Sequence, residues 1–291
     1  MITLQDMPDD VLELIYSNLS INDSVNTNIA LHKNIIKSKI TEIYDTDKFK
    51  LIPKCYHKYI NIIPILEIKE ESELIQYSDV YGINIWLHQS INLLKFNNLN
   101  LLFCYRCCSI NDDLSDNHID ISSLTTLTYL NCHSTQIYGI NNLTNLIELY
   151  CEYSNIKYVN NLTNLTHLNC TGTLVDNIDN LTNLEVLYMD ETYITKINHL
   201  INLRILACEG TEIDDISNLV NLEELYCTES FIENIDNLIN LKICHCYDTK
   251  IRSIKYNTKL EELYTNVFIE ILEEMKSRIK IESTTSNIIL P

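Results

Sequence analysis

Thiols are the groups in this sequence with the widest chemical scope, because a cysteine can bind a metal, form a disulfide or act as a nucleophile. The chain contains eleven cysteines, and most recur at intervals of nineteen or thirty-eight residues: Cys132, Cys151, Cys170, Cys208, Cys227 and Cys246. A column of this kind indicates a small apolar side chain packed inside a repeat, in a compartment that keeps thiols reduced. Cys104, Cys107 and Cys108 form a CxxCC run, but no second pair stands at zinc spacing. We therefore expect core packing, no metal site and no cofactor.

Signatures of catalysis are missing from the sequence. It has only four glycines and no Gly-rich phosphate loop, it contains no HExxH motif, and it lacks a set of Ser, His and Asp that spacing would bring together. We predict that the chain is not an enzyme.

Tyrosines and acidic residues form the pattern that best predicts a binding surface. Tyr150, Tyr188 and Tyr226 are separated by thirty-eight residues, and acidic side chains follow them in the sequence. Tyrosine offers a large contact area at a small entropic cost, and carboxylates attract Lys and Arg. The predicted partner-binding residues are Tyr150, Glu152, Tyr188, Asp190, Glu191, Glu209, Tyr226, Glu229, His245, Asp248 and Tyr264.

A basic segment of another protein is the partner that this pattern favours, through cation–π contacts and charge pairing. The alternative is that tyrosine simply fits a β-surface, and that the thirty-eight-residue period records duplication of a doublet. Gly172 and Gly210 share this doublet period, so both explanations stay open.

A nineteen-residue repeat from Leu124 to Ile254 must position these side chains. With each opening leucine as position 0, positions 3 and 6 hold Leu except at Cys244, position 8 holds Cys except at Met189, and positions 13 and 16 hold Ile or Val. Positions 6 and 8 share one face of a short strand and position 7 takes the other. Later positions advance by threes, which favours 3₁₀-like turns. Stacking is predicted because it brings each buried Leu or Ile roughly 1.5–3 kcal/mol.

The unit LxxLxxLxCxxTxIxxIxN resembles the leucine-rich repeat. This resemblance implies an α/β solenoid with short parallel strands on the concave side and turn or 3₁₀ segments on the convex side. It also implies that position 7, on the strand face, is the contact surface. The chain departs from the family at position 11, where Thr or Ser replaces Asn. We expect these hydroxyls to bond neighbouring backbone groups instead.

Residues 6–19, DMPDDVLELIYSNL, predict an amphipathic helix that Asp6 caps. The segment resembles the opening of the F-box, usually written LPxELLxxIFSYL, and the resemblance weakens over residues 20–42. It implies docking on a Skp-type adaptor of a cullin ubiquitin ligase. The docking residues would be Met7, Pro8, Val11, Leu12, Ile15 and Leu19. The alternative is an ordinary helical cap on the repeat array.

Four segments are expected along the chain. They are an F-box-like helical segment (1–45), a helical linker and amino-terminal cap (46–95), the leucine-rich repeats (96–266), and a carboxyl-terminal cap and tail (267–291). Within the linker, Trp86, Leu87, Leu93 and Leu94 stand at roughly helical intervals. Phe268–Lys280 is expected to form a capping helix, because the last repeat needs a polar outer face.

The overall charge limits the partners. A net charge of −19 and a pI near 4.7 argue against nucleic acid and against an anionic membrane surface. No apolar run approaches the ~18–20 residues of a membrane span, and the amino terminus lacks the layout of a secretory signal. We expect a cytoplasmic monomer with protein partners. The enrichment in Ile, Asn and Tyr is typical of AT-rich genomes, such as those of amoebae and the giant DNA viruses that infect them.

The predicted function is that of a protein–protein interaction adaptor. The amino-terminal segment would engage a Skp/cullin-type ubiquitin ligase, and the solenoid would hold a basic substrate protein. Two alternatives remain: a stand-alone leucine-rich repeat scaffold with no ubiquitin-ligase role, and a structural component of a virion or matrix.

Overall fold

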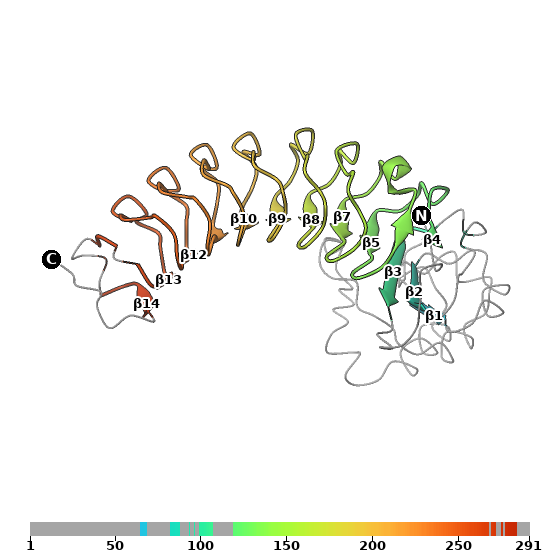
Figure 1. The fold of residues 1–291 in the computed structure, drawn as a ribbon, viewed down its shortest axis with the longest axis horizontal. Helices are drawn as coiled ribbons and strands as arrows, with labels where there is room; N and C mark the ends of the chain where they lie inside the picture. Colours follow the sequence, from blue (N-terminus) through green and yellow to red (C-terminus); the bar gives the residue numbers. More distant parts are fainter. Residues whose placement is uncertain are drawn as a thin grey trace, which may run out of the picture.

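Stacked turns of chain form an arc with strands on its inner side and tight turns on its outer side (Figure 1). This computed structural model describes residues 65–68, 82–87, 93, 96, 99–106, 119–267, 269–271, 275 and 277–283. Within these residues, twelve strands form one parallel sheet in the order β1-β2-β3-β5-β7-β8-β9-β10-β11-β12-β13-β14. The predicted F-box-like segment lies outside the described residues.

The strands of this sheet are short, and from β5 to β13 they follow one another at the nineteen-residue repeat interval. Their bounds are β1 Ile65–Ile68, β2 Gly82–Leu87, β3 Leu101–Arg106, β5 Tyr129–Asn131, β7 Glu148–Tyr150, β8 His167–Asn169, β9 Val186–Tyr188, β10 Ile205–Ala207, β11 Glu224–Tyr226, β12 Ile243–His245, β13 Glu262–Thr265 and β14 Lys280–Ser283. A separate pair joins β4 Ile119–Asp120 to β6 Ile137–Tyr138. Leu149 pairs with Leu168, and Leu168 with Leu187, so equal positions of successive repeats lie side by side.

A single hydrophobic core runs through the whole arc. Leu146, Leu165 and Leu184 are each fully buried, and they belong to a cluster that extends from Leu93 to Ile279. The position-8 cysteines are free thiols inside this cluster. The stacked solenoid predicted from the leucine and cysteine columns is therefore confirmed.

The outer side consists of tight turns. In the unit that opens at Leu162, the Leu162 N–H donates to the Val159 carbonyl at 2.9 Å and the Leu165 N–H donates to the Leu162 carbonyl at 3.0 Å. Other units repeat these bonds between residues three apart, which is the pattern of 3₁₀ structure. Among the described residues, only Ile140–Asn142 (η2) forms a complete 3₁₀ helix.

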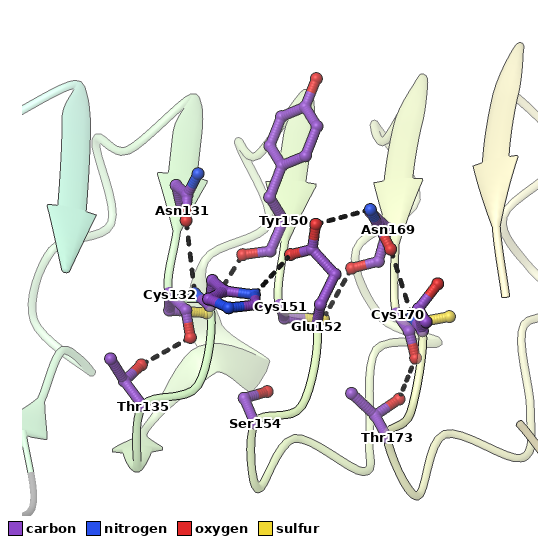
Figure 2. A network of polar contacts seen from close by, with 12 residues as sticks. Asn131, Cys132, Thr135, Tyr150, Cys151, Glu152, Ser154, Asn169, Cys170 and Thr173 are labelled. Carbon is purple, nitrogen blue, oxygen red and sulfur yellow. Dashed lines mark hydrogen bonds and ion pairs between the residues drawn. The ribbon is translucent and has the colours of Figure 1, made fainter. Parts of the chain in front are cut away.

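Two ladders of side-chain hydrogen bonds add to the backbone bonds. At position 11, the threonine hydroxyls donate to the position-8 carbonyl of the same turn, as Thr135 and Thr173 do at 2.6 Å (Figure 2). At position 2, asparagine amides donate to the preceding turn, as Asn202 Nδ2 does to the Thr182 carbonyl at 3.0 Å. The first ladder confirms the expectation for position 11. The second was not predicted, although the recurring LxNL pattern carried its signal.

Both ends of the sheet differ from the sequence-based expectation. Residues 65–68 and 82–87 are strands and not part of a helical linker, because β1 pairs in register with β2 and β2 pairs in register with β3. At the other end, Glu270 bridges to Ser253, and β14 pairs with β13. The capping helix expected over 268–280 is thus wrong at residues 269–271 and 280. Buried Ile269 and Ile271 still cover the last turns.

No helix in the described part of the chain is both long and apolar enough to cross a membrane.

Candidate partner-binding surface

The predicted tyrosines lie in one line across the inner face, the side of the sheet opposite the core. Strand register places the position-7 residues side by side, from Tyr150 through Asn169, Tyr188, Ala207, Tyr226 and His245 to Tyr264. All four tyrosines are half-buried. We call Tyr150, Tyr188, Tyr226 and Tyr264 the tyrosine row.

Aromatic contacts extend the row at both ends. Near the amino-terminal end, the ring centroids of Phe103 and Tyr129 lie 4.8 Å apart, and those of Tyr129 and Tyr150 lie 5.5 Å apart. Near the other end, the His245 ring lies 4.7 Å from Tyr226 and stacks on Tyr264 at 4.0 Å.

Tyr188 stands between these two aromatic patches, beside Asn169 and the small Ala207. The contribution of Tyr129 to this surface was missed. It occupies position 5, which shares the inner face with position 7.

Three members of the row carry a glutamate partner two residues earlier. The Tyr150 hydroxyl donates to Glu148 Oε2 at 3.2 Å, the Tyr226 hydroxyl donates to Glu224 Oε2 at 3.0 Å, and Tyr264 makes the same bond to Glu262. These three Glu-Leu-Tyr triplets, 148–150, 224–226 and 262–264, are called the ELY sites. Tyr188 follows Val186 and has no such partner at position 5. The prediction omitted the ELY glutamates, although the recurring triplet is visible in the sequence.

Burial and the adjacent carboxylates hold the tyrosine hydroxyls in the protonated state. Burial, with the charge of Glu148, raises the pKa of Tyr150 to about 12. Burial and Glu224 also raise the pKa of Tyr226 to about 12. These phenols therefore act as hydrogen-bond donors to the adjacent glutamates at neutral pH.

The predicted carboxylates border the row in the turns that follow the strands. Glu152 Oε1 accepts a bond of 2.6 Å from Asn169 Nδ2, and Glu152 Oε2 lies 3.9 Å from His133 Nδ1 (Figure 2). Asp190 accepts the Glu209 backbone N–H at 2.7 Å. Burial raises the pKa of Asp190, and the charges of Glu209 and Glu191 add to this effect.

The remaining border residues share an unusual backbone conformation. Glu191, Glu229 and Asp248 all stand at position 10, with φ of 56°, 57° and 52°. Gly172 and Gly210 occupy the same position with φ of 65° and 63°. Every repeat thus places a left-handed residue here, which explains why glycine is accepted in the column.

A polar groove follows the opposite, amino-terminal ends of strands β8 to β13. It has a volume of about 770 Å³. Its walls come from positions 2 and 4, including Asn202, Arg204, Glu223 and Lys242. Glu223 pairs with Arg204 Nη2 at 2.7 Å and with Lys242, so these three charges in the groove are paired with one another.

Among the residues that the structure describes, neither thiols nor metal-type clusters form an alternative site. In the part of the chain that the structure describes, no group of three His, Cys, Asp or Glu residues could hold a metal ion. Burial raises the pKa of the Cys170 thiol to about 12, so this cysteine is a protonated core residue at neutral pH.

Comparison with known proteins identifies the fold but no family. No protein-family model and no curated protein matches the sequence. Among solved structures, an internalin (inlF) from Listeria monocytogenes is similar at 18% identity, with a TM-score of 0.53 over 76% of this chain and 78% of that one.

Two further structures of similar fold show how widely this architecture is used. The functional domain of InlJ from Listeria monocytogenes, which includes a cysteine ladder, is 21% identical, with a TM-score of 0.52 over 77% of this chain and 55% of that one. The plant peptide hormone receptor RGFR1, in complex with RGF2, is 15% identical, with a TM-score of 0.52 over 76% of this chain and 42% of that one. The chain therefore has the fold of the leucine-rich repeat solenoids.

Proposed function

We propose that this chain is a non-catalytic binding protein that holds a segment of another protein along its inner face. The observation that carries the proposal is the tyrosine row, half-buried on a continuous parallel sheet and flanked by carboxylates. Half-buried tyrosines offer broad contact surfaces whose side chains are already ordered, so binding costs little additional entropy. The architecture is shared with a receptor solved in complex with RGF2, so a solenoid of this fold is known in a complex.

Charge supports a basic segment as the partner. The chain carries a net charge of −19, and the ELY glutamates and the border carboxylates concentrate negative charge around the row. Complementary charge increases the rate of association and selects against acidic partners. An enzymatic role has no comparable support, because the tyrosine hydroxyls and the buried thiols have raised pKa values.

Affinity capture with the full chain tests the proposal. Changing Tyr150, Tyr188 and Tyr226 together to Ser should remove the partners that the native chain captures. The matched control changes Tyr138, Tyr158 and Tyr193 to Ser, because these tyrosines are exposed away from the inner face. Retention of every partner by the first variant would exclude the inner face as the binding surface.

The finer form of this function is that of a substrate adaptor of a Skp/cullin-type ubiquitin ligase. It is supported by the F-box-like residues 6–19, which lie outside the described residues. A pull-down with a Skp-type protein should succeed with the native chain and fail after Leu12→Asp and Ile15→Asp. Asn18→Asp provides a control in the same segment. If the native chain, the Leu12→Asp and Ile15→Asp variant and the Asn18→Asp control are all recovered equally, the result favours the stand-alone scaffold.

A further inference from the structure

Strand β14 brings a lysine, Lys280, onto the inner face. Register sets Lys280 beside Glu262 and Glu282 beside Tyr264. The Lys280 ammonium lies 3.1 Å from the Tyr264 hydroxyl, 3.8 Å from Glu262 Oε2 and 5.3 Å from the Tyr264 ring centroid. It also pairs with Glu282 at 2.9 Å. Glu262 and Tyr264 of the last ELY site, together with Glu282, thus hold an ammonium group through hydrogen bonding, charge and cation–π contact.

The other two ELY sites have the same residues without a cation. At Glu148–Tyr150, the residue in the register of Lys280 is His167 on β8, and at Glu224–Tyr226 it is Ile243 on β12. Within the described residues, neither Glu148 nor Glu224 forms an ion pair with a Lys or Arg, whereas Glu223, Glu233 and Glu262 each do. Both sites combine a carboxylate and a half-buried ring, as Glu262 and Tyr264 do, and they lack the lysine. They also lack a counterpart of Glu282, because register places Asn169 beside Tyr150 and His245 beside Tyr226.

We infer that Glu148–Tyr150 and Glu224–Tyr226 each bind one lysine ammonium of an extended partner segment, in the manner in which Glu262 and Tyr264 hold Lys280. This inference rests on the proposed function and specifies the chemistry of its partner. A cation placed there gains both the carboxylate charge and the ring face. Val186 occupies position 5 before Tyr188, so Tyr188 has no glutamate partner there and offers only its ring.

Sheet geometry sets the spacing of the two partner lysines. Four steps along the sheet, through β8, β9 and β10, separate β7 from β11. At ~4.8 Å per step, the two open sites are about 19 Å apart, and an extended chain spans that distance in about six residues at ~3.3 Å each. An even separation also directs both lysines to the same side of the extended segment. The expected partner motif is therefore two lysines about six residues apart.

Synthetic extended peptides and the full chain test the inference. A peptide with two lysines about six residues apart should bind roughly fivefold more tightly than one with lysines about three residues apart. Acetylation of both lysines, which removes their charge, should cause a similar loss. Affinity is measured by fluorescence anisotropy at low and high salt, because charge pairing on an exposed face weakens as salt is added.

A variant that carries its own lysines at the two open sites gives the most direct test of the inference. His167→Lys and Ile243→Lys place lysines at the register of Lys280, so the double variant should block the peptide while keeping the fold. The double variant His167→Gln and Ile243→Gln is the matched control and should bind as the native chain does. Glu148→Gln with Glu224→Gln should reduce affinity roughly fivefold.

The outcomes separate the inference from the proposed function. If captured partners depend on Tyr150 and Tyr226 but are unaffected by Glu148→Gln with Glu224→Gln, the inner face binds and lysine recognition at the ELY sites is wrong. Equal binding of native and acetylated peptides, or no binding of either, also overturns the inference. If partners do not depend on the tyrosines, the proposed function itself fails.

Discussion

At the scale of single residues, the inner face differs from an ordinary acidic surface in how its phenols and carboxylates are paired. Tyr226 donates to Glu224 and contacts His245, so its ring and hydroxyl are both held before any partner arrives. Preorganised groups of this kind bind with less loss of entropy than free side chains do.

The pairing of Tyr226 with Glu224 predicts a specific pH dependence. The pKa of Tyr226 is raised to about 12, above the ~10 of an unfolded chain. A raised folded pKa contributes stability that is complete below pH ~10 and is lost as the pH rises through about 12. Glu224→Gln should lower the pKa of Tyr226 toward its ordinary value, as measured by NMR of labelled tyrosine rings. Glu185→Gln should leave it unchanged. An unaltered titration after Glu224→Gln would contradict this account.

Gly210 provides a prediction about the left-handed column. Its φ is 63°, and an added Cβ would meet nothing within 4 Å. Only the backbone conformation opposes a side chain there, so Gly210→Ala should lower the free energy of unfolding by about 1–2 kcal/mol. Gly210→Asn should cost less, because asparagine visits this conformation more readily. Chemical denaturation followed by circular dichroism measures both, and equal stability of the two variants would argue against the conformational cause.

At the scale of elements, the two side-chain ladders explain how three-residue strands remain ordered. Each short strand shares its backbone bonds with two neighbours, and a hydroxyl at position 11 adds a buried bond in the turn that follows. The asparagine ladder at position 2 secures the turn that precedes the strand, but it does so in exposed surroundings.

This difference in burial predicts unequal effects of mutation. Thr211 Oγ1 donates to the Cys208 carbonyl at 2.7 Å inside the core. Thr211→Val removes this donor and should cost about 1–3 kcal/mol, the range for a buried group left without its partner. Asn202→Ala removes an exposed bond and should cost about 0.5–1.5 kcal/mol. Thr211→Ser, which keeps the hydroxyl, is the control. A larger effect at Asn202 than at Thr211, measured by denaturation, would refute the ranking.

At the scale of the whole molecule, each turn contacts its neighbours and little else. Stability should then be a sum over turns and their interfaces. Whole turns can consequently be removed without loss of the fold, provided that the register of the Leu and Cys columns is kept.

Deletion of residues 181–199, one nineteen-residue unit, tests this property. The shortened chain should remain folded, with a cooperative transition by circular dichroism, because Leu162 is then followed by Leu200 at the correct interval. Deletion of residues 181–190 alone breaks the register and should cause aggregation. The full-unit deletion also brings β7 one strand closer to β11. The preferred lysine spacing should therefore shorten to about four or five residues.

Sequence alone determined the stack, the inward columns and the tyrosine row. The physical reason is that residues nineteen apart occupy equal positions in successive turns and therefore share the same environment. Leu146, Leu165 and Leu184 stand at one such position, and all three are buried. The ELY glutamates were within reach of the same reasoning, since position 5 shares its face with position 7. The prediction omitted them because it included only acidic residues that follow a strand, whereas Glu148, Glu224 and Glu262 each begin one.

Tertiary structure alone decided which strands form the two ends of the sheet, and that Lys280 lies on the ELY site of residues 262–264. β1, β2 and β14 have no repeat signal that local periodicity can detect, and each becomes a strand because the neighbouring turn offers unpaired backbone groups. Lys280 reaches Tyr264 only through this pairing. Contacts between distant residues depend on the energy of the assembled sheet, and therefore no local pattern in the sequence revealed the lysine held on the tyrosine row.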